Sequence, residues 1–159
     1  MESEIVSPAG TPRRDFLKMA GAGAGAVALS LVPLRAEATP ESVMAAIGKL
    51  IGEKAVKEGR MKMVLAEIAE NGGTVPFSVS VDSPMTAADH VKALHIFADG
   101  NPSPDVASYF FGPHNGKAGV SIRLRLAKSQ AVVAVAEMNN GDVFIGRRKI
   151  KVTIGGCGG

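Results

Sequence analysis

Three segments of the chain, 78–81, 120–126 and 149–154, alternate between apolar and polar residues, and this period of two limits the fold more than any other feature. Successive side chains of a β-strand point to opposite faces of a sheet, so the alternation predicts strands with one buried face. Less regular apolar runs of strand length lie at 61–66, 91–98, 107–111, 131–138 and 143–145. Together these segments predict about seven or eight short strands.

Turn residues separate several of these segments. Asn-Gly pairs occur at 71–72, 115–116 and 140–141, and both residue types tolerate positive φ. Short strands joined by such turns predict a mainly β fold, an antiparallel β-sandwich of immunoglobulin-like architecture over residues 60–154. The antibody subtype is excluded, because the chain has one cysteine and no tryptophan.

A short helix is expected before the strands, in a helical segment spanning residues 39–59. Thr39 is a suitable N-cap, Pro40 suits the first helical position, and Glu41 favours the positive end of the helix. Apolar residues then recur at helical spacing, at Val43, Ile47, Leu50 and Ile51. This spacing predicts one apolar face along the helix.

Residues 1–38 have the pattern of an export signal. An arginine pair at 13–14 precedes a weakly apolar stretch at 19–34, and the Ala-Glu-Ala sequence at 36–38 fits an A-x-A cleavage site. The segment resembles a twin-arginine signal, which implies export of a folded protein to the periplasm. After cleavage at Ala38 we expect no membrane anchor.

Composition and spacing exclude several kinds of site. The net charge of +3 is too small for nucleic-acid binding, so no nucleic-acid partner is expected. One cysteine cannot form an internal disulfide, and His90, His95 and His114 lack the spacing of metal ligands, so no metal site is expected. Ser83, Asp89 and His90 invite a hydrolase triad, but the Gly-x-Ser-x-Gly turn is missing and no catalytic residue is expected.

Two pairs of cations lie on strand faces in the C-terminal half of the chain. Arg123 and Arg125 share one face of their strand, as do Lys149 and Lys151. Each pair suits a solvated face, or alternatively a surface that attracts anions or docks a partner.

The last five residues place the only cysteine of the chain, Cys157, between two pairs of glycines. Glycine has the largest backbone freedom of any residue and brings no side chain to a core. Gly155, Gly156, Gly158 and Gly159 are therefore expected to form a flexible arm, residues 155–159, that carries the thiol up to roughly 10 Å beyond the last strand. A thiol without a base fixed beside it suits a residue on which other proteins act.

With this C-terminal motif the sequence resembles a known family, SoxY, the sulfur-carrying subunit of the periplasmic Sox thiosulfate-oxidation system. The resemblance lies at residues 81–86, 89–91, 123–127, 129–130 and 152–159, together with the twin-arginine leader. It implies an immunoglobulin-like fold and a heterodimer with SoxZ. It also implies that sulfur intermediates, a thiosulfonate and a persulfide, are bound covalently to Cys157.

The same resemblance implies that the chain is a carrier and not an enzyme. Three enzymes of the system would act on it in transient contacts: a haem protein that conjugates thiosulfate to the thiol, a hydrolase that releases sulfate, and a sulfane dehydrogenase. No cofactor is expected on the chain itself, because the sulfur is held by a covalent bond.

Two other functions remain open on the sequence. A ubiquitin-like sulfur carrier would form a thiocarboxylate at the terminal pair Gly158 and Gly159, although such carriers need ATP and a helix in mid-domain. A structural domain would be tethered through an intermolecular disulfide at Cys157. The site of any bound sulfur and the effect of a reductant on the oligomeric state distinguish these functions.

We predict that the periplasmic protein begins at Thr39, because the arginine pair and the 36–38 motif together define an export signal with a cleavage site. N-terminal sequencing of protein from the periplasmic fraction measures this directly. A mature chain that retains residues before Ala36 would contradict the prediction.

Overall fold

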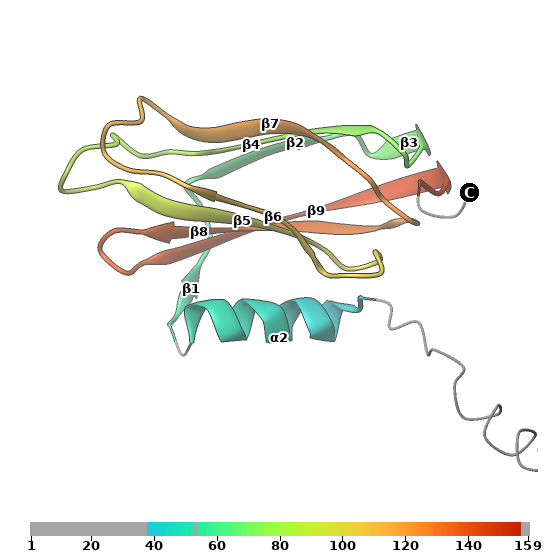
Figure 1. The fold of residues 1–159 in the computed structure, drawn as a ribbon, viewed down its shortest axis with the longest axis horizontal. Coiled ribbons are helices and arrows are strands. Elements are labelled where there is room, and N and C mark those ends of the chain that lie inside the picture. Colours follow the sequence, from blue (N-terminus) through green and yellow to red (C-terminus); the bar gives the residue numbers. More distant parts are fainter. Residues whose placement is uncertain (1–37, 53, 157–159) are drawn as a thin grey trace, which may run out of the picture. The chain divides into compact units, whose positions relative to one another are not determined.

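The computed structural model of the chain describes residues 38–52 and 54–156. Residues 1–37 of the predicted export signal, and the part of the predicted arm from Cys157 to Gly159, lie outside the described residues. The described elements are one helix and nine strands (Figure 1): α2 (Pro40–Ile51), β1 (Val56–Lys57), β2 (Met61–Leu65), β3 (Ile68–Asn71), β4 (Val75–Val81), β5 (Val91–Ala98), β6 (Asp105–Phe110), β7 (Ala118–Leu124), β8 (Gln130–Met138) and β9 (Val143–Ile154).

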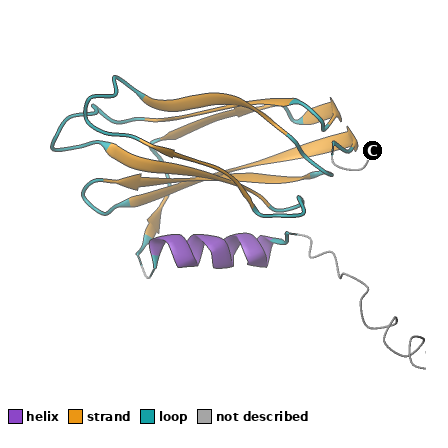
Figure 2. Cartoon of the chain, in the orientation of Figure 1, coloured by secondary structure: helices purple, strands orange, loops and turns teal. Residues whose placement is uncertain are grey.

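The strands form two sheets, and α2 covers the outer face of one of them (Figure 2). A six-stranded sheet has the order β1-β9-β8-β5-β6, with β3 also paired to β9, and a three-stranded sheet has the order β2-β4-β7. The prediction of a mainly β, immunoglobulin-like sandwich with a short N-terminal helix is confirmed. Two pairings differ from an all-antiparallel sandwich, because β1 and β3 both run parallel to β9.

The core between the two sheets is made by strands whose sequence alternates. Along β4, Val75, Phe77, Val79 and Val81 are buried while the residues between them are exposed or half-buried. Leu94 on β5 is fully buried in the same cluster. The alternation in the sequence therefore predicted the correct inner face of this strand.

Strand β8 has a different pattern because both of its faces are covered. Val132 and Ala134 lie in the core between the sheets, whereas Val133 and Val135 lie in a second cluster with the helix residues Val43, Ile47 and Ile51. A strand buried on both faces reads as a continuous apolar run. The run of apolar residues at 131–136 is thus explained by the helix on the outer face of the sheet.

The helix begins as the sequence predicts. The Thr39 hydroxyl accepts a hydrogen bond from the Ser42 amide, the Ser42 hydroxyl accepts one from the Thr39 amide, and Pro40 occupies the first turn. Two parts of the sequence interpretation need correction. The helix ends at Ile51, because Gly52 has a φ of 65°, and β1 occupies part of the segment 39–59 that was expected to be helical. Leu50 is 39% exposed and does not belong to the buried stripe.

Ala38 belongs to the folded unit as well. Its side chain is buried, and its amide donates a 2.8 Å hydrogen bond to the carbonyl of Asn101. Cleavage after Ala38 would remove both contacts and leave the new amino terminus at the N-cap position. Within the described residues, no helix is both long and apolar enough to cross a membrane.

We predict that Ile47→Ala lowers the free energy of unfolding by about 2–4 kcal/mol, because it leaves a cavity between α2 and the six-stranded sheet. Met44→Ala, on the exposed face of the same helix, is the matched control and should change stability by less than about 0.5 kcal/mol. Urea unfolding followed by circular dichroism measures both. Equal effects of the two substitutions would show that the apolar face of the helix does not hold it on the sheet.

Candidate functional site at the C-terminal end of β9

The two residues before Cys157, Gly155 and Gly156, directly follow the end of β9. Strand β3 pairs in parallel with this end, with Ala69 opposite Val152 and Asn71 opposite Ile154. On the other edge, the amide of Val152 donates a 2.9 Å hydrogen bond to the hydroxyl of Ser129. The strand end that leads into the predicted arm is therefore held on both edges.

Gly155 and Gly156 do not extend freely from this strand end. The amide of Gly156 donates a 2.9 Å hydrogen bond to the carbonyl of Leu126, and the amide of Leu126 donates a 2.8 Å hydrogen bond to the carbonyl of Gly72. We call the backbone of Gly72, Leu126 and Ala127 the cradle. The cradle holds the two glycines that precede the cysteine.

The cradle accepts only residues without a side chain. A Cβ on Gly155 would overlap the carbonyl oxygen of Ala127, and a Cβ on Gly156 would overlap the carbonyl of Gly72. On Gly72 it would overlap the carbonyl oxygen of Leu126. Neither Gly155 nor Gly156 has a φ in the left-handed region. Close approach of backbone to backbone, and not conformational freedom, is what requires glycine at these positions.

This finding changes the interpretation of the predicted arm. The sequence predicts that residues 155–159, with their four glycines, form a flexible arm. The structure gives Gly155 and Gly156 a packing role at the root of the arm, whereas Cys157, Gly158 and Gly159 lie outside the described residues. The assignment of Cys157 as the site of sulfur attachment, and of the glycines around it as a swinging arm, stays a prediction.

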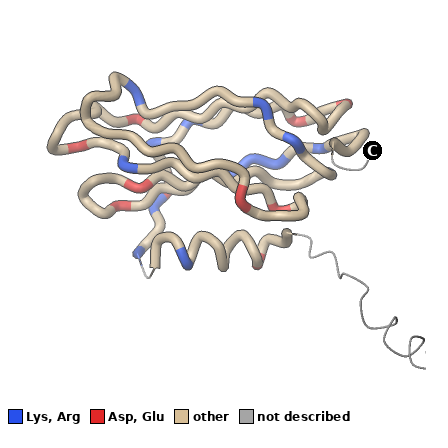
Figure 3. Tube along the Cα trace, viewed as in Figure 1, with Lys and Arg blue, Asp and Glu red and all other residues tan. Residues whose placement is uncertain are grey.

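Four cations lie on or next to the two strands that lead toward the cradle. Arg123, Arg125, Lys149 and Lys151 are exposed, and they lie on β9, on β7 and just after β7 (Figure 3). Within the described part of the chain none of these four forms an ion pair with a carboxylate. The structure therefore keeps both alternatives of the sequence analysis, a solvated face and a surface that attracts anions.

The residues of the possible hydrolase triad do not form one. The hydroxyl of Ser83 donates to the backbone carbonyl of Asp89 and accepts from the amide of Met85. Nδ1 of His90 lies 2.9 Å from the backbone carbonyl of Thr86. These bonds shape the loop between β4 and β5. The carboxylate of Asp89 pairs with the guanidinium of Arg60, so each of the three side chains has a structural partner.

The buried histidine is part of the sheet, as the sequence indicates. His95 is 5% exposed; its Nδ1 lies 2.7 Å from the hydroxyl of Ser108 on the neighbouring strand, and its Nε2 lies 3.4 Å from a carboxylate oxygen of Glu137. Phe110 packs edge-on against the ring. In the described part of the chain no group of three or more His, Cys, Asp and Glu residues is placed to hold a metal ion.

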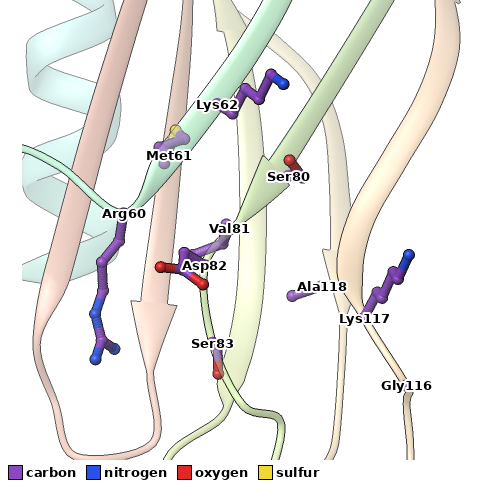
Figure 4. A pocket seen from close by; sticks show the side chains of 10 residues that line it. All are labelled: Arg60, Met61, Lys62, Ser80, Val81, Asp82, Ser83, Gly116, Lys117 and Ala118. Atoms are coloured by element: carbon purple, nitrogen blue, oxygen red, sulfur yellow. The ribbon is translucent and has the colours of Figure 1, made fainter.

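A hollow of about 600 Å³ lies at the other end of β4 from the cradle. It is lined by Arg60, Met61, Lys62, Ser80, Val81, Asp82, Ser83, Gly116, Lys117 and Ala118. Figure 4 shows that Arg60 points away from Lys62 and Lys117, so the three cations do not converge on one ligand. Arg60 is paired with Asp89 at 3.1 Å, and this hydrogen bond raises the pKa of the guanidinium.

Sequence reasoning missed the residues of the cradle. The sequence analysis treats Gly72 as a turn residue and Leu126 as the end of a strand, and it includes Ala127 only in the segment 123–127 that resembles the family. A signal for the contact exists in the sequence, because a second glycine pair at 72–73 accompanies the pair at 155–156. Paired glycines in two distant segments are typical of backbones that approach closely.

Comparison with known proteins supports the export signal and the fold. Residues 11–30 match the twin-arginine translocation pathway signal sequence, so the chain is exported to the periplasm by that pathway. No curated protein matches the chain. Superoxide reductase (neelaredoxin) from Ignicoccus hospitalis superposes with a TM-score of 0.53 at 24% identity, over 73% of this chain and 94% of that one. A putative superoxide reductase from Thermotoga maritima gives a TM-score of 0.50 at 23% identity, over 65% and 89%. These two similarities show a shared fold alone.

A sulfur carrier protein is more similar. The structure of SoxY from Chlorobium limicola f thiosulfatophilum superposes with a TM-score of 0.62 at 32% identity, and the match covers 73% of this chain and all of that one. Residues 47–157, which include the cradle and Cys157, match the family model described as sulfur oxidation protein SoxY. The chain therefore belongs to the SoxY family of sulfur oxidation proteins.

Proposed function

We propose that this chain is a covalent carrier of sulfur intermediates in periplasmic thiosulfate oxidation, with Cys157 as the attachment site. The observation that carries the proposal is the position of the only cysteine of the chain, one residue after a glycine that is hydrogen-bonded to the cradle. Membership of a family of sulfur oxidation proteins and the export signal support it.

The proposed chemistry has two steps at the thiol. In the first, the Cys157 thiolate and thiosulfate form an S–S bond, which gives the thiosulfonate Cys–S–S–SO₃⁻ and releases two electrons to the haem of a conjugating enzyme. In the second, water cleaves the terminal S–S bond, so that sulfate and two protons leave and the persulfide Cys–S–S⁻ remains. A sulfane dehydrogenase then oxidises the outer sulfur of the persulfide: three water molecules supply the oxygen atoms, six electrons pass to the dehydrogenase, and Cys–S–SO₃⁻ forms with release of six protons. A second hydrolysis releases sulfate and two protons and regenerates the thiolate. The carrier itself needs no cofactor, because the covalent bond holds each intermediate.

The alternative of a ubiquitin-like carrier receives less support from the fold. In residues 54–156 the described elements are all strands, and α2 precedes the first of them. The mid-domain helix expected of that class is thus not found in the described residues between the strands. A tether through an intermolecular disulfide remains the alternative that also uses Cys157. The effect of a reductant on the oligomeric state distinguishes it from the carrier function.

We predict that Cys157→Ser abolishes thiosulfate oxidation by the reconstituted system, because a serine hydroxyl cannot form a persulfide. Intact-mass spectrometry of the wild type after incubation with thiosulfate and the conjugating enzyme should show the addition of one S₂O₃ group, removed by reductant. Thr153→Ser, an exposed change at the end of β9, is the control and should retain activity.

Three outcomes would contradict the carrier function. Sulfur on the terminal carboxyl of the Cys157→Ser variant would favour the ubiquitin-like alternative. A reductant-sensitive dimer that is indifferent to thiosulfate would favour the disulfide tether. Wild-type turnover by the Cys157→Ser variant would show that the thiol is not the carrier.

The proposed carrier acts as a heterodimer with SoxZ. Large apolar side chains remain on the surface of the described unit and support a partner that covers some of them. The exposed set is Met44, Leu50, Val56, Val64, Ile68, Phe110 and Ile154, among which Phe110, at the end of the edge strand β6, is 78% exposed.

We predict that the mature chain alone self-associates and that it forms a one-to-one complex when SoxZ is added, because the partner buries apolar surface. Size-exclusion chromatography with light scattering measures the stoichiometry, and binding of a hydrophobic dye should fall on complex formation. A stable monomer at micromolar concentration that ignores SoxZ would contradict this assignment of the partner.

A further inference from the structure

We propose that Gly72 is a positioning residue for Cys157. It fixes the backbone of Gly156, the residue directly before the cysteine, which we call the root of the arm. The inference rests on the carrier function proposed above and adds a residue from a distant part of the chain to it.

The first observation is a continuous set of backbone hydrogen bonds through Gly72. Its amide donates to the carbonyl of Ile154 at 2.7 Å, and its carbonyl accepts from the amide of Leu126 at 2.8 Å. The carbonyl of Leu126 in turn accepts from the amide of Gly156 at 2.9 Å. Both polar groups of Gly72 are thus used, and the last bond of the set ends on the residue before Cys157.

The second observation is the steric fit between Gly72 and Gly156. A Cβ on Gly72 would overlap the carbonyl oxygen of Leu126 and stand 2.9 Å from the amide nitrogen of Gly156. Real Cβ atoms essentially never approach heavy atoms within 3.0 Å. A Cβ on Gly156 would overlap the carbonyl of Gly72 in the same way. The two glycines therefore depend on each other, and a side chain on either one separates them.

A third observation concerns the turn that presents Gly72 to the arm. The side-chain oxygen of Asn71 accepts a 2.7 Å hydrogen bond from the amide of Gly73, which holds residues 71–73 in a tight turn. Asn71 is also the register partner of Ile154. The side chain of Asn71 therefore sets the shape of the turn through a hydrogen bond. This bond can be removed by substitution without a steric clash in the cradle.

A fixed root has a functional consequence. Gly156, the residue before Cys157, is held at one place on the folded unit by its hydrogen bond to Leu126, and consecutive Cα atoms are about 3.8 Å apart. Backbone residues that are already ordered lose little entropy when a partner's pocket binds the arm. Ordering each additional free residue weakens binding by roughly 5- to 30-fold. Release of the root should therefore raise the KM of the conjugating enzyme for the carrier and leave kcat nearly unchanged.

The test uses the mature chain in complex with its partner and four variants. Gly72→Ala forces the cradle apart, and Asn71→Ala removes the hydrogen bond of the turn without a steric clash. Asn71→Asp keeps the acceptor oxygen and should restore wild-type behaviour. Gly112→Ala is the matched control, because a Cβ there meets nothing within 4 Å.

Two readouts are measured on each variant. Amide hydrogen exchange by NMR should show protection of the Gly156 amide in the wild type, Asn71→Asp and Gly112→Ala, and loss of that protection in Gly72→Ala and Asn71→Ala. The KM of the conjugating enzyme for the carrier should rise about 5- to 30-fold in Gly72→Ala and Asn71→Ala, with kcat changed by less than about twofold. A residue with a purely structural role would lower the unfolding temperature and leave KM unchanged.

Each result decides the proposal. Equal exchange of the Gly156 amide in all variants, or a wild-type KM where protection is lost, overturns it. If Gly72→Ala does not fold, Asn71→Ala and its rescue by Asn71→Asp give the answer. Failure of the carrier function itself has a different signature, which is thiosulfate oxidation that persists in Cys157→Ser. The exchange of the Gly156 amide does not depend on sulfur chemistry.

Discussion

Strand β9 is the element on which the rest of the structure depends, because both of its edges are paired. One edge pairs with β8 from Val143 to Ile150, and the other pairs with β1 near Val143 and with β3 near Ile154. Pairing near both ends of the strand restrains it against fraying. Its outer face holds α2 through Val143, and the carbonyl of its last residue, Ile154, accepts a hydrogen bond from the amide of Gly72 in the cradle. The position of the arm root is thus set by the same pairings that close the sheet.

The sequence predicted the alternating strands well and the short ones poorly. Periodicity identified β4 and β7, and helical spacing identified the buried face of α2. Strands β1 and β3 have two and four residues, with hardly any buried side chain, so they give no periodic signal. The continuity of β9 was also missed, because Gly146 interrupts the apolar pattern. In the structure, a Cβ on Gly146 would stand 2.7 Å from the sulfur of Met63, so glycine admits the methionine from the other sheet.

The candidate site was predictable only in part, and the reason is geometric. Cys157 between glycine pairs is visible along the chain, since its neighbours are local. The cradle brings Gly72 and Leu126 to Gly156 from distant parts of the chain. The pairing of β3 with β9 places Gly72 there, and the end of β7 leads to Leu126. The glycine pairs at 72–73 and 155–156 are the trace of this contact in the sequence, but no local pattern shows that these two segments meet. The glycines of the motif therefore have two different explanations. Gly155 and Gly156 are required by close backbone packing, whereas for Gly158 and Gly159 the sequence predicts conformational freedom.

The cations on the strands that lead to the cradle bear on the proposed function, in which anionic sulfur species would approach the arm. Arg123 and Arg125 lie at the end of β7, and Lys149 and Lys151 lie on β9, so the two strands that lead to the cradle also carry the positive charge (Figure 3). In water two unit charges 10 Å apart interact by only about 0.4 kcal/mol, and salt screens this further. Such charges cannot hold thiosulfate in place. Their effect on a charged partner or substrate is on the rate of encounter, and the covalent bond of the proposed function would supply the retention that the charges lack.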